Sequence, residues 1–158
     1  YIVAFIIAYL IGSVPTAVWI GKLFYGIDVR EYGSGNSGAT NTFRVLGKNA
    51  GIPVLFFDVL KGTCAVLLVK FFSVEGKSEA FIINMELAFG IAALLGHIFP
   101  VYVGFRGGKG IATLLGIMLA VHPKAAFISS SVLVSLISII FTFNIITINK
   151  NKTKIYKI

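Results

Sequence analysis

Long apolar runs alternate with short polar stretches along the chain. Four runs of about twenty residues, 1–20, 52–72, 80–99 and 125–143, each have the length that a helix needs to cross the hydrocarbon core of a bilayer. A fifth run, 111–121, is too short to cross alone, and we expect a half-helix or a tilted span buried in protein. The pattern predicts an all-α, polytopic membrane helix bundle with five hydrophobic segments.

Two of these runs contain residues that interrupt an apolar helix. Gly12, Ser13 and Pro15 break the first run, which a membrane helix tolerates when its neighbours satisfy the backbone. The second run holds Asp58 and Lys61, which are three residues apart and so share one helix face. Ionisable groups inside a bilayer usually face a polar interior, which makes this pair a supporting part of a functional site. The alternative is that both lie near the headgroups and anchor the helix.

The composition favours a membrane protein and excludes several other classes. Of the 158 residues, 57% are apolar and 13% are charged, whereas a soluble domain has about a quarter charged. The formal charge of +8 is dispersed among the apolar runs, which disfavours a nucleic-acid partner. Cys64 is the single cysteine, so neither an intrachain disulfide nor a cysteine metal cluster is expected. We expect Cys64 to pack against its apolar neighbours.

The densest polar stretch is 33–44, with the sequence Gly-Ser-Gly-Asn-Ser-Gly-Ala-Thr-Asn-Thr-Phe-Arg. Its glycines can adopt positive φ and turn successive N–H groups toward one phosphate. A helix over 39–46, ended by Gly47, would point its positive N-terminal end at the same anion, and Arg44 adds a guanidinium that grips phosphate. An ordinary loop has the same composition, and that alternative stays open on this stretch alone. The candidate ligands are Ser34, Gly35, Asn36, Gly38 and Asn41, with Thr40 as a further donor.

A second glycine-rich stretch, 105–113, has the sequence Phe-Arg-Gly-Gly-Lys-Gly-Ile-Ala-Thr. A cation surrounded by glycines and followed by a helix-compatible run predicts a second anion site. The spacing differs from a Walker A loop, which disfavours a nucleoside triphosphate. The candidate ligands are Gly107, Gly108, Lys109, Gly110 and Thr113.

Loop charges predict how the chain is oriented. If five segments cross, the basic residues of 22–48, of 106–109 and of the tail lie on one side, which the positive-inside rule makes cytoplasmic. Both glycine-rich stretches then share a face, where two phosphorylated molecules can meet. We divide the chain into a membrane domain, 1–143, and a basic low-complexity tail, 144–158, suited to anionic headgroups.

The sequence offers few groups for chemistry beyond these two sites. It has neither a zinc-ligand pattern nor a Ser-His-Asp series, and no metal is expected. Catalysis would therefore rest on positioning and on charge stabilisation by Arg44, Lys109 and backbone N–H groups. His97, in the segment Gly-His-Ile-Phe-Pro before the second stretch, acts as an acid or base, or else orients its own loop.

Three motifs resemble those of the bacterial acyl-phosphate:glycerol-3-phosphate acyltransferases, the PlsY family. They are 33–44, the Asp-Val-Leu-Lys-Gly segment 58–62, and 96–100 together with 105–113. The resemblance implies a transferase of phospholipid biosynthesis in the bacterial inner membrane, with about seven segments and no cofactor. Its reaction moves a fatty acyl group from acyl phosphate to the sn-1 hydroxyl of glycerol 3-phosphate, giving lysophosphatidic acid and phosphate. The first motif would line the substrate site, and the second would bind phosphate.

The third motif of that family, His-x-x-Asn-x-x-Arg followed by a Glu, is not intact. The best register places Asn144 on the Asn, with Phe141 in the His position and Thr147 in the Arg position. The tail and the smaller number of segments favour a truncated or frameshifted product whose activity is in question. Sequencing the gene through its 3′ end tests this hypothesis.

Two functions of other classes stay open on the sequence. One is an anion transporter or channel whose helix ends bind phosphate without chemistry. The other is an inactive remnant or a structural subunit. An assay with acyl phosphate and labelled glycerol 3-phosphate separates the three functions. Acyl-chain preference and oligomeric state are not predicted.

Overall fold

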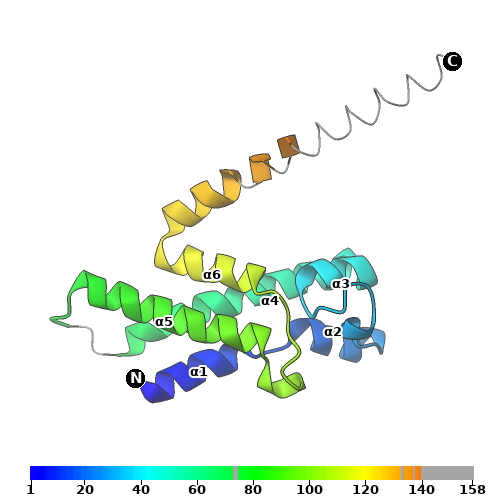
Figure 1. Ribbon diagram of the computed structural model, residues 1–158, viewed down its shortest axis with the longest axis horizontal. Coiled ribbons are helices and arrows are strands. Elements are labelled where there is room, and N and C mark those ends of the chain that lie inside the picture. The colour runs from blue at the N-terminus through cyan, green and yellow to red at the C-terminus, as the bar shows by residue number, and fades with distance from the viewer. Residues whose placement is uncertain (73–74, 133, 137, 140–158) are drawn as a thin grey trace, which may run out of the picture. The chain divides into compact units, whose positions relative to one another are not determined.

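The computed structural model describes residues 1–72, 75–132, 134–136 and 138–139. They divide into two compact units, Tyr1–Pro123 and Lys124–Ile158. The described residues contain helices and turns without a strand, which confirms the all-α prediction. In the first unit (Figure 1) the helices are α1 Ile2–Gly12, α2 Thr16–Tyr25, α3 Ala39–Leu46, α4 Lys48–Leu67, α5 Glu79–Ile98 and α6 Ile111–Val121, with 3-10 turns η1 Val29–Glu31, η2 Leu68–Phe71 and η3 Val101–Val103.

Three helical segments are long and apolar enough to cross a membrane, and they match the first three predicted runs. They are Ile2–Tyr25, Lys48–Phe71 and Glu79–Val103. The short run 111–121 forms α6, which has the predicted bounds and is only 11 residues long. The long run 125–143 extends beyond the described residues. The tail, with Phe141, Asn144 and Thr147, lies wholly outside them.

The first crossing segment is broken in the middle, where the sequence has Ser-Val-Pro. Proline has no N–H and cannot continue the hydrogen-bond ladder of a helix, so α1 ends at Gly12 and α2 begins at Thr16. The α2 helix then runs to Tyr25, beyond the predicted end at residue 20. It stops at Gly26, whose left-handed φ of +69° forms the C-cap.

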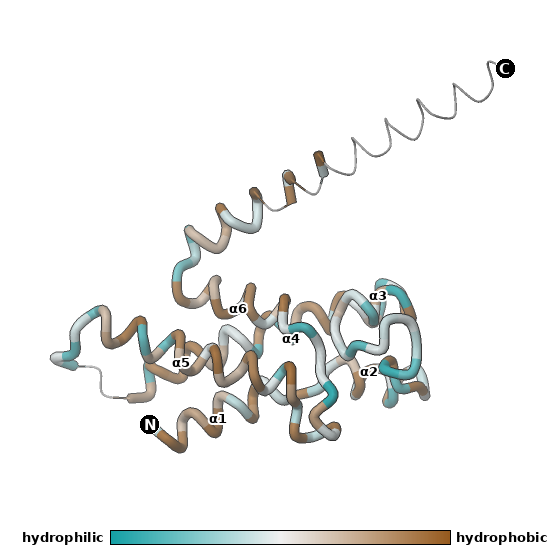
Figure 2. Tube along the Cα trace, in the orientation of Figure 1, coloured by the Kyte–Doolittle hydropathy of each residue, from teal (hydrophilic) through white to brown (hydrophobic). Residues whose placement is uncertain are grey.

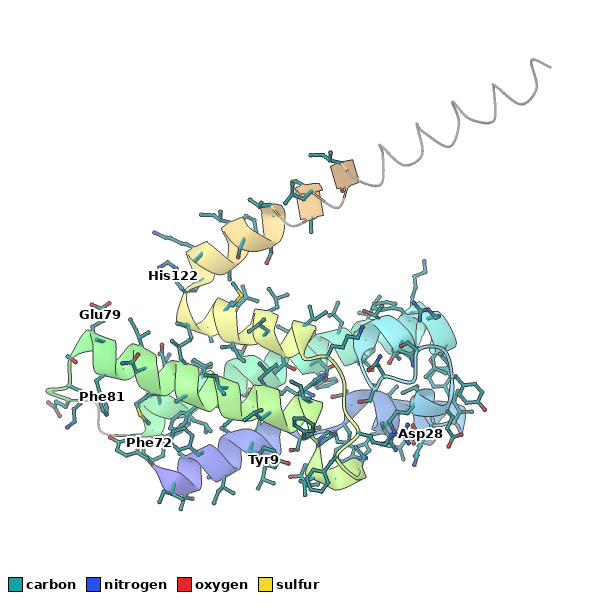
Figure 3. All side chains as sticks on the ribbon, viewed as in Figure 1. Tyr9, Asp28, Phe72, Glu79, Phe81 and His122 are labelled. Carbon is teal, nitrogen blue, oxygen red and sulfur yellow. The ribbon has the colours of Figure 1, made fainter. Side chains whose placement is uncertain are left out.

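Small residues let the crossing helices approach closely. A Cβ atom added to Gly12 of α1 would collide with the backbone of Ala93 in α5, and one added to Gly62 of α4 would collide with the carbonyl of Thr113 in α6. Such contacts replace the missing hydrophobic driving force between helices in lipid. The Tyr9 hydroxyl also donates a hydrogen bond of 2.7 Å to the carbonyl of Phe99 (Figure 3).

Large apolar side chains face outward in the first unit, while alanines, valines and Phe89 fill most of its interior. Phe71, Ile2 and Leu23 are each more than three-quarters exposed, whereas Ala8 and Phe89 are fully buried. Figure 2 shows the same apolar character along α1, α5 and α6. A bilayer would cover such an outer surface. Cys64 is also exposed on α4, so the expectation that it packs against its neighbours is wrong.

Both glycine-rich stretches lie toward the same end of the first unit. Because α4 and α5 run in opposite directions, the end of α2, the start of α4 and the end of α5 come together there (Figure 1). The turn before α5 lies at the other end. Figure 2 shows hydrophilic residues around α3, at the end of the unit that carries the glycine-rich stretches.

An apolar helix, Pro123–Leu136, is described in part, and from Lys124 onward it belongs to the second unit. Its serines bond to their own helix: the Ser129 hydroxyl donates to the Ala125 carbonyl at 2.7 Å, and the Ser135 hydroxyl to the Ser131 carbonyl at 2.9 Å. Such bonds satisfy the hydrogen-bond donor of a serine hydroxyl within its own helix, so no second helix is needed to accept it.

Candidate functional site

The first glycine-rich loop is shaped by two left-handed glycines and one buried amide. Gly33 and Gly35 have φ of +61° and +73°, as predicted, but Gly38 has an extended backbone with φ −116°. The Ser34 N–H donates to Asn41 Oδ1 at 2.9 Å, and a side chain at Gly33 would collide with that oxygen. The loop therefore folds around Asn41.

Asn41 has no spare hydrogen-bond donor for a ligand. Its side chain is 2% exposed, and Nδ2 donates to three carbonyl oxygens, those of Val29 at 2.8 Å, Tyr32 at 3.1 Å and Asn36 at 3.0 Å. The expectation that Asn41 offers a free donor to phosphate is therefore wrong. The side chain instead fixes the loop on which the other candidates lie.

The other candidates of this loop remain accessible. Ser34, Gly35 and Thr40 are exposed, and Asn36 and Gly38 are half-buried. Helix α3 has the predicted bounds, Ala39–Leu46, with Gly47 as its C-cap. Its first hydrogen bond runs from the Thr42 N–H to the Gly38 carbonyl, so the N–H groups before it are available, as at any helix start.

Arg44 in the last turn of α3 is exposed. Within the described part of the chain it makes neither an ion pair nor a side-chain hydrogen bond. An unpaired guanidinium near neutral donors is a suitable partner for a phosphate.

The second glycine-rich loop is folded back on the end of α5. The Gly107 N–H donates to the Ile98 carbonyl at 3.1 Å, and the Gly108 N–H donates to the His97 carbonyl at 3.2 Å. A Cβ atom on Gly108 would collide with Nε2 of His97. These two N–H groups are thus not available to an anion, contrary to the prediction, and the glycines serve close approach instead.

Two cations of the second loop are exposed, Arg106 and Lys109. Gly110 follows with φ +77° as the N-cap of α6, whose first bond runs from the Leu114 N–H to the Gly110 carbonyl. Thr113, by contrast, is fully buried. It packs against Gly62 of α4, so its side chain does not reach the loop surface where we expected it.

His97 lies beneath the second loop. Its side chain is buried, and Nδ1 is 3.8 Å from Asp58 Oδ1, which is too far for a hydrogen bond. The ring supports Gly108, and its own backbone carbonyl holds the Gly108 N–H. Of the two roles that the sequence left open, this geometry favours the orientation of the loop.

Asp58 and Lys61 form a buried ion pair. The Asp58 Oδ1 and Lys61 Nζ atoms are 2.9 Å apart, and both side chains are less than 10% exposed. Lys61 Nζ also donates to the Val14 carbonyl at 3.1 Å, in the break between α1 and α2. Their burial rules out the alternative in which both anchor α4 among the headgroups. Ser13 and Thr16 add buried hydroxyl groups on either side of the same break.

Arg30 is a residue that the sequence argument did not single out. Its guanidinium binds the Asp28 carboxylate and also donates to the carbonyls of Val103 and Arg106, before and at the start of the second loop. This hydrogen-bonded cation holds the pKa of Asp28 well below its usual range, and the carboxylate raises the pKa of Arg30. Figure 3 labels Asp28 at the loop end of the first unit. The Asp-x-Arg spacing predicts the local pair but not the contact with the second loop.

Arg30, in η1 just before the first glycine-rich loop, therefore links that loop to the start of the second. Arg44 is the exposed cation of the first loop, and the second loop has two, Arg106 and Lys109. Within the described residues there is no group of three His, Cys, Asp or Glu side chains that could hold a metal ion. The arrangement can bind two anionic groups and bring them together through positioned donors.

These features define a multi-pass helical membrane protein with two glycine-rich loops at one end of its bundle. The model of one protein family, described as glycerol-3-phosphate acyltransferase, matches residues 2–150. The chain belongs to this family.

Two curated relatives have the same description. A glycerol-3-phosphate acyltransferase of Enterococcus faecalis is 49% identical over 133 residues, covering 84% of this chain and 58% of its own length. One of Streptococcus sanguinis is 50% identical over 122 residues, covering 77% of this chain and 53% of its own length. The chain thus spans somewhat more than half the length of these relatives.

Two crystal structures of PlsY, an integral membrane glycerol 3-phosphate acyltransferase, have the same fold. Its glycerol 3-phosphate form aligns with a TM-score of 0.73 at 43% identity, over 85% of this chain and 64% of that one. Its lysophosphatidic acid form aligns with a TM-score of 0.69 at 40% identity. These matches confirm the family and the membrane helix bundle that the sequence predicted.

Proposed function

We propose that this protein transfers a fatty acyl group from acyl phosphate to the sn-1 hydroxyl of glycerol 3-phosphate, giving lysophosphatidic acid and phosphate. The observation that carries the proposal is the pair of Arg30 hydrogen bonds that joins η1, just before the first glycine-rich loop, to the start of the second. These two loops bear the exposed cations Arg44 and Lys109. Membership of the acyltransferase family supports it, as do the glycerol 3-phosphate and lysophosphatidic acid forms of the related PlsY structure.

Each loop would take one phosphate group. Arg44, with the exposed donors of 34–40, would bind the first, and Lys109, with the N–H groups at the start of α6, would bind the second. The resemblance associates the first loop with substrate and the second with phosphate. No cofactor or metal is part of the proposal.

The reaction needs little more than alignment and charge stabilisation. The sn-1 oxygen attacks the acyl carbon, a C–O bond forms, and the bond between that carbon and the phosphate oxygen breaks. The hydroxyl proton passes to a substrate phosphate, so no side-chain base is required. Arg44, Lys109 and nearby N–H groups would stabilise the negative charge that develops on the carbonyl and the leaving phosphate.

The buried residues act through the loops. Asn41 shapes the first loop, and His97 supports Gly108 in the second. Lys61 holds α4 against the break in the first crossing segment, and its partner Asp58 lies 3.8 Å from the His97 ring. All four would be positioning residues, because none of their side chains is exposed.

Both loops would face the cytoplasm, in the bacterial inner membrane. The basic residues around them satisfy the positive-inside rule in that orientation. The acyl chain of the donor would then stay in the bilayer while its phosphate reaches Lys109.

An acyl-transfer assay tests the proposal. Protein in lipid nanodiscs is given acyl phosphate and labelled glycerol 3-phosphate, and labelled lysophosphatidic acid is measured. We expect product with acyl phosphate and none with acyl-CoA or acyl carrier protein as the donor. Arg44→Ala and Lys109→Ala should each lower kcat/KM by about a hundredfold or more.

Lys48→Ala is the matched control, because Lys48 is also exposed but begins α4, outside both loops. It should retain wild-type activity. Phosphate flux in proteoliposomes without any lysophosphatidic acid would instead identify a transporter. Absence of both would identify an inactive or structural protein.

A further inference from the structure

The side chain of Arg30, just before the first glycine-rich loop, connects that region to the start of the second loop. Arg30 Nη1 donates to the Val103 carbonyl at 2.8 Å and to the Arg106 carbonyl at 3.3 Å. These carbonyls flank the segment that leads into Gly107 and Lys109. The first glycine-rich loop begins three residues after Arg30, at Gly33, so a single guanidinium lies at the entrance to both.

The Arg30 guanidinium is itself fixed by the carboxylate of Asp28. Its Nε and Nη2 atoms donate to the two oxygens of Asp28 at 2.9 and 2.7 Å, a bidentate pair. The Arg30 backbone N–H also donates to Asp28 Oδ1, at 3.0 Å, where Asp28 caps η1. The Asp28 and Arg30 side chains are 9% and 14% exposed, so bulk water screens this pair little.

The segment that Arg30 holds has an uncommon backbone. Gly104 and Phe105 both have positive φ, +70° and +59°, and Phe105 is the one non-glycine residue with positive φ in the described part of the chain. A bulky residue rarely adopts that conformation unless its surroundings impose it. The Arg30 bonds are made to the carbonyls just before and just after these two residues. The guanidinium therefore clamps the turn from both sides.

We propose that Arg30 is a positioning residue, a latch that clamps the 103–106 turn onto η1 and thereby sets the spacing between Arg44 and Lys109. The proposal rests on the function proposed above, in which these two cations bind the two phosphates. Without the latch the turn can relax, and Lys109 moves relative to the first loop. Misplacement of a binding group by about 1 Å can cost a hundredfold in rate.

Lys22 offers a matched control for the latch. Its Nζ lies 3.3 Å from the same Asp28 oxygen that Arg30 Nη2 binds, but its side chain is 57% exposed. It has no hydrogen bond to the second loop within the described residues. Lys22→Ala removes a cation from Asp28 and leaves the clamp intact.

The first experiment measures the loop spacing without reference to activity. Spin labels are placed at Tyr32 and Val101, which are exposed and outside the phosphate sites, in a Cys64→Ala background in nanodiscs. The distance distribution should be narrow in the parent and in Lys22→Ala. It should broaden in Arg30→Gln, and broaden less in Arg30→Lys, which keeps the charge but not the fork of donors.

The second experiment measures acyl transfer by the same variants. Arg30→Gln should lower kcat by about ten- to a hundredfold while KM for glycerol 3-phosphate changes less, because each separate phosphate site is intact. In Arg30→Ala, millimolar guanidinium chloride should restore part of the activity, whereas sodium chloride should not.

The outcomes separate the latch from the proposed function. An unchanged distance distribution in Arg30→Gln overturns the latch, as does a broadened distribution with unchanged kcat. If the parent protein has no acyl-transfer activity, the proposed function fails, and the spin-label distances still decide whether Arg30 holds the turn. If Arg30→Gln does not fold, Arg30→Lys and Asp28→Asn give the same comparison.

Discussion

At the scale of single residues, the glycines have two different roles that the sequence pattern does not distinguish. Gly33 and Gly35 provide left-handed turns, whereas Gly108 provides space for a neighbouring ring. Gly38 has an extended backbone and no heavy atom within 4 Å of an added Cβ. A methyl group at each position therefore tests a different property.

Gly108→Ala should destabilise the protein by about 1–3 kcal/mol, the usual cost of overpacking, because the buried His97 ring cannot move aside freely. Gly38→Ala should leave stability unchanged within about 0.5 kcal/mol. If a phosphate approaches the Gly38 backbone, that variant should raise KM for glycerol 3-phosphate. Denaturation midpoints and kinetics of both variants give the comparison. Equal stability of the two variants would contradict the packing argument at Gly108.

Motif-based prediction did not identify the side chains that hydrogen-bond to the protein's own backbone, Asn41 and Arg30. The sequence placed Asn41 in the helix 39–46 and predicted that its amide would offer a donor to phosphate. It could not indicate that this amide donates to the carbonyls of Val29, Tyr32 and Asn36. Arg30 was missed for a related reason, because its partner carbonyls lie 73 and 76 positions away. Local spacing carries no information on contacts of that range.

At the scale of helices, the bounds were predictable wherever a local signal ended the element. Gly47 ends α3 and Gly110 begins α6, at the predicted residues. The break between α1 and α2 followed from Pro15 in the same way. The burial of the Asp58 and Lys61 side chains could not be predicted from the α4 sequence. It depends on the neighbouring helices that cover the face of α4 on which both residues lie.

The Asp58–Lys61 pair should behave as a buried ion pair. Removing one charge, in Asp58→Asn or Lys61→Met, should destabilise the bundle by about 3–5 kcal/mol, because the remaining charge is left buried without its partner. The double variant Asp58→Leu/Lys61→Met should recover most of that loss. Unfolding free energies in mixed micelles measure the cycle. Single variants as stable as the wild type would show that water reaches the pair.

At the scale of the whole molecule, the proposed acyl transfer requires both loops to face one compartment. Hydrophobic run lengths predicted the three long segments, and their alternating direction brings the loops to the same end. The membrane itself decides which side that end faces, through loop charges rather than through packing.

Labelling of single cysteines tests this orientation in the Cys64→Ala background. We expect Tyr32→Cys and Arg106→Cys to react together, from the cytoplasmic side only, with a membrane-impermeant maleimide. Lys77→Cys, in the turn before α5, should react from the opposite side. Proteoliposomes of known orientation provide the control. Tyr32→Cys and Arg106→Cys on opposite sides would be incompatible with the proposed transfer.

The interruption at Pro15 has an effect well beyond its own segment. In an unbroken helix the Val14 carbonyl would accept the amide four residues later. Here it accepts the Thr16 N–H and the Lys61 ammonium, each at 3.1 Å. A main-chain oxygen and the Asp58 carboxylate thus together stabilise a cation buried in the bundle. Pro15 therefore helps to stabilise the charge of Lys61, although the proline is far from that residue in the sequence. A comparison limited to the residues of the two loops would miss this effect.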